Sequence, residues 1–327
     1  MTHQIRTPLF LICLTALTCT YTQVHAADAR IGFLSPATAE SSAIVLDGLR
    51  QGLRENGYLE GRNLIIEVRF ANGKFEQLPD LARNLINLPV NVLVTFVTQA
   101  TIAARDNTKT VPIVMIGVSD PVLSGVVSSL SRPGGNVTGT SGMSSDIAGK
   151  QLQLLSEVIP GAKRIAVLWN PVNSVFQRQL LREAESAARP LGLELQMFEG
   201  SDAESIEKAF VAMSNGRISG LFVLLDPTLS ANSARIAALA VRARLPSISG
   251  SSVYAEANGL MAYGPSFPEL ARSAGAYVAK ILNGAKPDDL PVERPTNFEF
   301  VINLKAAKNI GQHIPQTLRL RADRLIE

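Results

Sequence analysis

Residues 111–139 read VPIVMIGVSDPVLSGVVSSLSRPGGNVTG, and this stretch indicates how the whole chain is organised. Its apolar beginning, residues 111–118, is typical of a parallel strand that is covered on both faces. The later Arg132-Pro133-Gly134-Gly135 combines proline, which fixes the backbone angle φ, with glycine, which frees it. We therefore predict that this stretch is the passage between two domains and that a binding site lies beside it.

Upstream of this passage, short apolar strands alternate with amphipathic helices. The expected strands cover residues 30–34, 64–70, 90–97 and 111–118. The helix expected at 75–88 shows the pattern most clearly, because its leucines recur at helical spacing along one stripe. Strand–helix alternation with short connections predicts a doubly wound parallel sheet. We assign residues 27–140 to an N-terminal α/β lobe.

The same alternation starts again beyond the passage. Strands are expected at 164–169, 193–198, 220–225, 246–248 and 260–263, with helices at 144–159, 174–189, 203–214 and 230–244. This pattern predicts a second doubly wound parallel sheet. We assign residues 141–264 to a C-terminal α/β lobe, so the expected fold class is α/β with two lobes.

The remaining residues, 265–327, do not contain enough elements for a third domain. A helix is expected at 265–282, followed by three spaced prolines and a strand at 298–302. We expect this segment to return to the first lobe, to lie mostly on it, and to tie the lobes together. Two lobes joined by several strands form a hinge, which suits closure on a small ligand.

The first 26 residues differ from the rest of the chain. Arg6 precedes an apolar run at 9–17, and Val24-His25-Ala26 forms a small-x-small cleavage site. This pattern predicts a secretory signal peptide at 1–26 and a periplasmic protein. The alternative is a membrane anchor, but the apolar run is shorter than the roughly 20 residues that span a bilayer. Lipid anchoring at Cys19 is a weaker alternative, because Thr18 precedes that cysteine.

The composition removes several classes of function. The chain has 31 basic and 28 acidic residues without a basic block, so nucleic acid is not an expected partner. Both cysteines leave with the signal peptide, and His313 is then the only histidine. A catalytic triad or a multi-histidine metal site would lack its usual residues. We expect a monomer without catalytic residues, metal or cofactor.

Candidate ligand-binding residues follow from a rule for parallel sheets, in which ligands sit outside the carboxyl ends of the strands. The residues at these strand ends are Ser35, Thr98, Gln99, Asp120, Asn170, Asp226, Ser249 and Ser251. Tyr254 and Tyr263, further along the chain, are candidates for lining an aromatic pocket.

Three of these residues suggest how an amino acid could bind. Thr98 begins an expected helix, where its hydroxyl and free backbone N–H groups could hold a carboxylate. Asp120 or Asp226 could accept hydrogen bonds from an ammonium group. Both aspartates precede proline, however, so each could instead cap a helix.

Several motifs resemble one bacterial protein family along nearly the whole mature chain. They are IGFLSP (31–36), RQGLRENGY (50–58), EGRN (60–63), DPV (120–122), SRPGGNVTG (131–139), NP (170–171) and VINLK (301–305). The chain resembles the substrate-binding proteins of ABC transporters whose relatives take up tryptophan, tyrosine or related aromatic compounds. This resemblance implies a type I periplasmic-binding-protein fold, an interlobe site for an amino acid or aromatic acid, a permease as partner, and no enzymatic activity. The alternative is a periplasmic sensing subunit that presents its liganded form to a membrane receptor.

Overall fold

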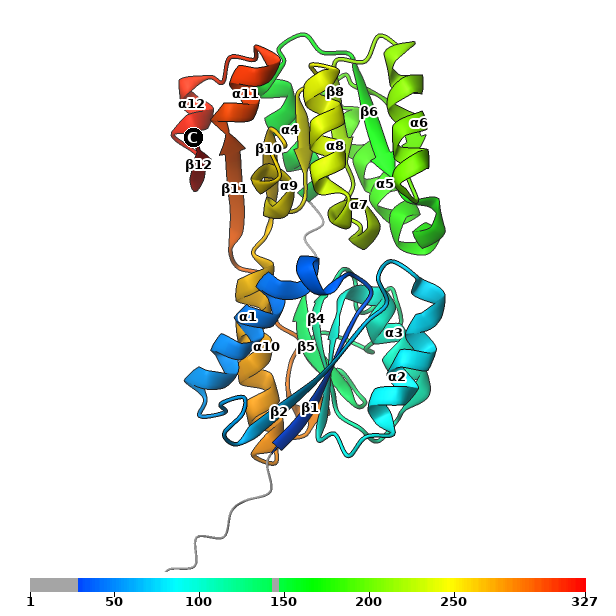
Figure 1. Cartoon of the computed structure of the whole chain (residues 1–327), viewed down its shortest axis with the longest axis vertical. Coiled ribbons are helices and arrows are strands. Elements are labelled where there is room, and N and C mark those ends of the chain that lie inside the picture. Colours follow the sequence, from blue (N-terminus) through cyan, green and yellow to red (C-terminus); the bar gives the residue numbers. More distant parts are fainter. Residues whose placement is uncertain (1–28, 143–146) are drawn as a thin grey trace, which may run out of the picture.

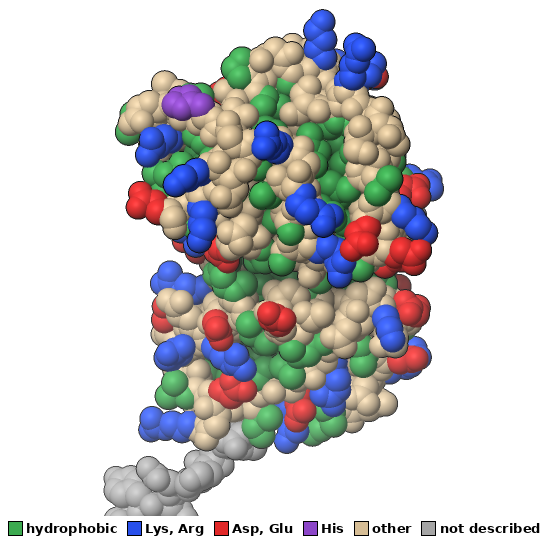
Figure 2. Space-filling view, turned by 45° about the horizontal axis from the view of Figure 1, so that its top comes forward, with side chains coloured by type: hydrophobic (Ala, Val, Ile, Leu, Met, Phe, Trp, Pro, Cys, Tyr) green, Lys and Arg blue, Asp and Glu red, His purple; other side chains and the backbone are tan. Residues whose placement is uncertain are grey.

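The computed structural model describes residues 29–142 and 147–327. The expected signal peptide, residues 1–26, lies outside these described residues, as do both cysteines. The described chain forms two α/β lobes, one above the other in Figure 1. In the space-filling view of Figure 2 the boundary between the lobes appears as a waist, and basic and acidic side chains are interspersed over both lobes.

The N-terminal lobe is built on a parallel sheet of five strands in the order β2-β1-β3-β4-β5. The strands are β1 (Ala29–Ser35), β2 (Leu64–Phe70), β3 (Val92–Phe96), β4 (Ile113–Val118) and β5 (Val137–Ser141). Helices α1 (Ala39–Glu55) and α10 (Phe267–Leu282) cover one face. On the other face lie η1 (Phe75–Gln77), α2 (Leu78–Ile86) and α3 (Val97–Asn107). The doubly wound parallel arrangement expected for this lobe is confirmed.

Strand β5 was not predicted. Its sequence VTGTS is short and polar and follows Pro-Gly-Gly, so it has the composition of a turn rather than of a strand. In the structure all five of its residues are buried beside β4, and the Thr138 hydroxyl donates to the Leu290 carbonyl at 2.6 Å. The passage between the lobes therefore begins after this strand.

The C-terminal lobe has a sheet of seven strands in the order β12-β11-β10-β9-β8-β6-β7. The strands are β6 (Arg164–Trp169), β7 (Glu194–Glu199), β8 (Gly220–Val223), β9 (Ser247–Ser249), β10 (Met261–Pro265), β11 (Phe298–Asn303) and β12 (Arg324–Ile326). The pairs are parallel except β10 with β11, which is antiparallel.

Helices cover both faces of this second sheet. They are α4 (Ile147–Val158), α5 (Ser174–Ala188), α6 (Ala203–Ser214), α7 (Pro227–Ala231), α8 (Ser233–Arg242), α9 (Ser252–Glu256), α11 (Leu304–Ile310) and α12 (Gln316–Arg319), with short η2 (Pro171–Asn173). Alternate residues of β6 show the two faces. Ile165 and Val167 pack in one core with α4 and α5, whereas Ala166 and Leu168 pack in another with α6 and α8.

The end of the chain departs from expectation. Helix α10 does return to the N-terminal lobe, but β11 and β12 belong to the C-terminal sheet, so the prediction that 265–327 lies mostly on the first lobe is wrong. Phe300 and Ile302 of β11 are buried in the C-terminal core. The edge of the N-terminal sheet at β5 is already taken by Glu293, whose backbone bonds Gly139 and Ser141.

The chain passes between the lobes three times. The crossings lie between β5 and α4, between β10 and α10, and between η3 (Pro287–Asp289) and β11. These crossings form the multi-strand hinge that the sequence predicted. With a sheet in each lobe, the architecture places the carboxyl ends of the mutually parallel strands toward the boundary between the lobes, whereas β11 and β12 run the opposite way.

Candidate ligand-binding site

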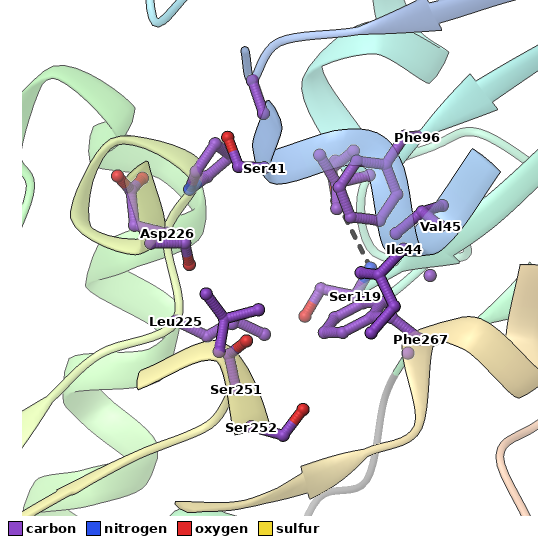
Figure 3. Close-up of a pocket in the computed structure, with 18 of the residues that line it drawn as sticks. Ser41, Ile44, Val45, Phe96, Ser119, Leu225, Asp226, Ser251, Ser252 and Phe267 are labelled. Atoms are coloured by element: carbon purple, nitrogen blue, oxygen red, sulfur yellow. Dashed lines mark hydrogen bonds between the residues drawn. The ribbon is translucent and has the colours of Figure 1, made fainter. Parts of the chain in front are cut away.

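A cavity lies between the two lobes, where the strands of both sheets end. Its volume is about 80 Å³, which is room for several water molecules. Residues from α1, β3, α3, β4 and the start of α10 form its N-terminal wall, and residues 225–227, 230 and 251–253 form its C-terminal wall. Figure 3 shows the two walls facing each other, with Phe96 and Phe267 on one side and Asp226 and Ser251 on the other.

The N-terminal wall is mainly apolar. The rings of Phe96 and Phe267 meet edge to face, with their centroids 5.6 Å apart and their planes at 87°. Phe96 ends β3 and Phe267 begins α10, so the sheet and the returning helix build this wall together. Ile44 of α1 completes it and is 39% exposed. A wall of this kind suits an apolar or aromatic group.

Free hydroxyl groups line the rest of the cavity. They belong to Ser119 of the N-terminal lobe and to Ser230, Ser251 and Ser252 of the C-terminal lobe. Within residues 29–142 and 147–327, none of these four hydroxyls has a hydrogen-bond partner. Each can donate one hydrogen bond and accept others, so the cavity presents polar groups that a ligand could satisfy.

Helix α3 begins directly after β3, without a connecting loop. Val97 makes the turn with φ of 58°, a left-handed conformation that is rare for a β-branched residue. Such conformations persist where the surrounding structure holds them, and they gather at functional sites. The turn brings Thr98 and Gln99 to the cavity. The N–H groups of a first helical turn have no partner within the helix and favour anions such as a carboxylate.

Asp226 lies beside the cavity, but hydrogen bonds already occupy its carboxylate. Its Oδ1 accepts from the Asn170 amide at 3.0 Å and from the backbone N–H groups of Thr228 and Leu229 at 2.8 and 3.2 Å. Its Oδ2 accepts from the Asn173 amide at 2.9 Å. Figure 3 shows the carboxylate turned away from the space between the walls. Asp226 thus caps α7, as the capping alternative predicted.

Burial dominates the electrostatics of Asp226. The residue is 1% exposed, and loss of solvent raises the pKa of its carboxyl above the ordinary value, while the amides of Asn173 and Asn170 act in the opposite direction. A buried carboxylate needs donors on both oxygens, and this one has them. Asp226 is therefore a structural centre of the C-terminal wall rather than a free acceptor for a ligand.

A hydrogen bond joins the two lobes at the edge of the cavity. The Gln99 side-chain amide donates to the Asn173 Oδ1 at 2.6 Å. Asn173 ends η2, is 7% exposed, and donates with its own amide to Asp226. Gln99 lines both the cavity and a larger open hollow of about 750 Å³, whereas Asn173 lines only the hollow. Gln99 therefore lies where the two spaces meet, together with Thr98 and Ser119, which also line both.

The structure brings four of the predicted residues to the cavity: Thr98, Gln99, Asp226 and Ser251. Thr98 also accepts the backbone N–H of Ser119 at 3.3 Å. Asp120 lies on the outer hollow instead, where its carboxylate accepts the N–H groups at 122 and 123 in a turn.

Five other predicted residues do not line the cavity, because their side chains are buried or contact other residues of the protein. Ser35 bonds Ser42 at 2.9 Å, and Asn170 bonds Asp226. The remaining three are Ser249, which is buried in β9, Tyr254, which bonds Ser247 at 2.7 Å, and Tyr263, which stacks on Phe298 at 6.0 Å. The strand-end rule identifies a position but not the direction in which its side chain turns.

Sequence reasoning missed much of the actual lining. Phe96, Ile44, Phe267, Ser230 and Ser252 line the cavity and are not among the residues that the strand-end rule selects. Phe267 follows a Pro-Ser dipeptide at a strand end, which is a signal that could have identified it. Ile44 and Ser230 lie on helices, and no strand-end pattern marks them.

Comparison with known proteins identifies the family. Residues 30–326 match the family model described as ABC transporter substrate binding protein, so the chain belongs to this family. Its members are substrate-binding proteins and not enzymes. The chain is also 28% identical over 258 residues to a tyrosine-binding protein from Clostridioides difficile, an alignment that covers 78% of this chain and 73% of that protein. Among the described residues, no helix has the length and apolar character to cross a membrane.

Solved structures of similar proteins share the fold. A conserved domain protein from Vibrio cholerae has a TM-score of 0.84 and 28% identity, over 91% of this chain and 99% of that one. An ABC domain from Streptococcus pneumoniae in complex with L-Trp also has a TM-score of 0.84, with 25% identity over 92% of this chain and 100% of that one. The ligand-free, open structure of a substrate-binding protein from Clostridium difficile has a TM-score of 0.66, with 26% identity over 91% of this chain and 99% of that one. The fold is that of a type I periplasmic binding protein, as predicted.

Proposed function

We propose that this protein binds an amino acid with an apolar or aromatic side chain in the interlobe cavity. The observation that carries the proposal is the composition of the cavity, in which an apolar wall containing Phe96 and Phe267 faces hydroxyls that have no partner in the part of the chain that the structure describes. A ligand that fits must combine an apolar body with polar groups at one end. The names of two relatives, a tyrosine-binding protein and an L-Trp complex, support the same ligand class.

The chemistry of the walls suggests how such a ligand would lie. Its side chain would pack against Phe96, Phe267 and Ile44, and its carboxylate would meet the start of α3 at Thr98. The hydroxyls on the opposite wall would accept from its ammonium group. Asp226, which the sequence suggested for this role, has its carboxylate occupied by protein donors.

The arrangement of the lobes supports closure around the ligand. At nearly the same sequence identity, the chain superposes better on the L-Trp complex than on the ligand-free open relative, with TM-scores of 0.84 and 0.66. The cavity is also enclosed by residues of both lobes. A ligand that contacts both walls binds the closed form better than the open form and therefore shifts the population toward closure.

The liganded protein would deliver its amino acid to the permease of an ABC importer. We infer an extracytoplasmic site of action, in the periplasm, from the predicted signal peptide at 1–26 and from the family. A single chain supplies both walls of the cavity, which agrees with action as a monomer. Loss of uptake of the bound amino acid in a deletion strain, restored by the intact gene, would test delivery.

Ligand binding can be measured directly. The mature protein is unfolded and refolded to remove carried-over ligand, and the twenty amino acids are then screened by melting temperature and by calorimetry. We expect saturable binding of tryptophan, tyrosine or phenylalanine, with a gain of about 2.7 kcal/mol in stability at a ligand concentration of 100 times Kd. Binding confined to small polar or charged amino acids would contradict the proposed class.

A further inference from the structure

We propose that Asp226 is a positioning residue for lobe closure. Its carboxylate fixes the orientation of the Asn173 side chain, and Asn173 then accepts a hydrogen bond from Gln99 that holds the lobes together. We call this bond between Gln99 and Asn173 the latch. The inference rests on the proposed ligand-binding function of the cavity. It assigns Asp226 a role that differs from both ligand contact and simple helix capping.

The orientation of Asn173 follows from hydrogen-bond chemistry. A carboxamide has a donor end and an acceptor end, whereas a carboxylate only accepts. The carboxylate of Asp226 is itself held by Asn170 and by two backbone N–H groups, so it cannot turn to suit its neighbour. The amide of Asn173 must therefore face Asp226, and its Oδ1 must face the other lobe. The acceptor for Gln99 is thus set in advance from within the C-terminal lobe.

The position of the bond makes it a latch. Gln99 belongs to α3 of the N-terminal lobe and Asn173 to η2 of the C-terminal lobe, so the bond exists only when the lobes are together. Gln99 also lies where the enclosed cavity meets the open outer hollow. A contact made only in the closed form stabilises that form and therefore slows the opening through which a ligand would leave.

Removal of either partner should speed ligand release. We expect Gln99→Ala and Asn173→Ala each to raise the dissociation rate of the amino acid at least about tenfold, which corresponds to about 1.4 kcal/mol, with little change in the association rate. The matched control is Asn107→Ala, because Asn107 lines the same hollow and lies on the same helix as Gln99, but its amide bonds the Ala103 carbonyl within that helix. Stopped-flow measurement with the tightest ligand gives both rates.

The two alanine variants differ in their structural cost. Asn173→Ala leaves the buried Oδ2 of Asp226 without its donor, so this variant will lose stability as well. Gln99→Ala leaves Asp226 untouched and keeps the test valid if the other variant fails to fold. A dissociation rate for Gln99→Ala equal to that of Asn107→Ala would overturn the latch.

A polarity exchange tests the positioning role itself. Gln99→Glu places an acceptor opposite the oxygen of Asn173, so we expect Kd to rise at least about tenfold. In an Asp226→Asn background the new amide donates to Asn173, which can turn over and present its own amide to residue 99. We expect the effect of Gln99→Glu to fall below about threefold there. An equal loss in both backgrounds would show that Asp226 does not set the orientation.

The latch and the ligand proposal can fail separately. Distances between spin labels on the two lobes report the closed population in ligand-free protein, and the latch predicts a smaller closed fraction for Gln99→Ala than for Asn107→Ala. If no amino acid binds the unmodified protein but this difference is present, the proposed ligand class is wrong and the latch stands. If amino acids bind and neither the rates nor the distances change, the latch is wrong and the function stands.

Discussion

The polar side chains at the cavity either form hydrogen bonds within the protein or remain available to bond a ligand. Asp226 and Asn170 are buried and fully engaged with each other and with backbone groups. The hydroxyls of Ser119 and Ser251 line the cavity without hydrogen-bond partners among the described residues. Because a buried polar group without a partner is costly, a bound ligand must satisfy the hydroxyls that it covers. This requirement favours ligands that carry polar groups at one end.

At this scale Phe267 is the residue we expect to contribute most to affinity. Phe267→Ala removes the edge-to-face partner of Phe96 and much of the apolar wall, so we expect Kd to rise about 10- to 100-fold. Phe267→Leu should lose less, since part of the apolar area remains. Phe75→Ala is the matched control, because Phe75 lines only the outer hollow. Calorimetry that gave the same Kd for Phe267→Ala and Phe75→Ala would place the ligand elsewhere.

At the scale of elements, the position of the site depends on how α10 packs against α1. The helices approach so closely that a Cβ atom at Gly52 would overlap the backbone carbonyl of Arg272, and one at Gly275 would lie 2.7 Å from the backbone nitrogen of Leu53. Helix α10 also carries Phe267 at its first residue. The glycines therefore set the depth at which α10 lies, and with it the apolar wall.

The crossing of α1 and α10 gives a stability prediction. Gly52→Ala forces two helix backbones apart, and we expect a loss of about 3 kcal/mol in the free energy of unfolding. Gly149→Ala in α4 is the control, since a Cβ there would only touch Ala187 at 3.4 Å. Alanine is the better helix former, so the control should gain up to about 1 kcal/mol. Urea unfolding of both variants measures the two changes in the free energy of unfolding. A gain in stability for Gly52→Ala similar to that for Gly149→Ala would refute the close approach of α1 and α10.

For the whole molecule, closure brings like charges together across the cleft. Glu183 of α5 is partly buried, and loss of solvent raises the pKa of its carboxyl, with a further rise from Asp120 of the other lobe. Gln179 and Arg182 on the same helix oppose this rise. Asp120 belongs to the other lobe, so its contribution to the raised pKa of Glu183 requires the closed form, and protonation of Glu183 therefore favours closure.

Ligand affinity should therefore depend on pH. A group with a raised pKa contributes most when protonated, so the stabilisation of the closed form is present at low pH and is lost as pH rises through the raised pKa of Glu183. We expect Kd for a neutral-side-chain amino acid to increase as pH rises from the ordinary pKa of a glutamate carboxyl toward neutral pH. Glu183→Gln should flatten this dependence. Titration calorimetry at a series of pH values measures this dependence of Kd in both proteins. The same dependence of Kd on pH in Glu183→Gln as in the unmodified protein would exclude Glu183 as the cause.

The sequence predicted where helices and strands form better than it predicted which strands pair and which helices pack together. The periodic leucines of α2 and the apolar run of β4 predicted those elements, because local burial imposes a pattern on consecutive residues. The same pattern could not tell that β11 pairs with β10, since an amphipathic strand can join the edge of either sheet. Tyr254 failed as a pocket residue for a related reason. Its burial against Ser247 depends on how α9 packs, which local sequence does not report.

By itself, the sequence determined two α/β lobes, a multi-strand hinge and membership of a family through motifs such as SRPGGNVTG. Only the tertiary structure decided which strand-end residues line the cavity and that Asp226 is occupied by protein donors. It also revealed the bond between Gln99 and Asn173, which are 74 positions apart. Periodicity is fixed by burial between neighbouring elements of one lobe, whereas contacts across the cleft depend on the angle at which the hinge brings two separately folded lobes together.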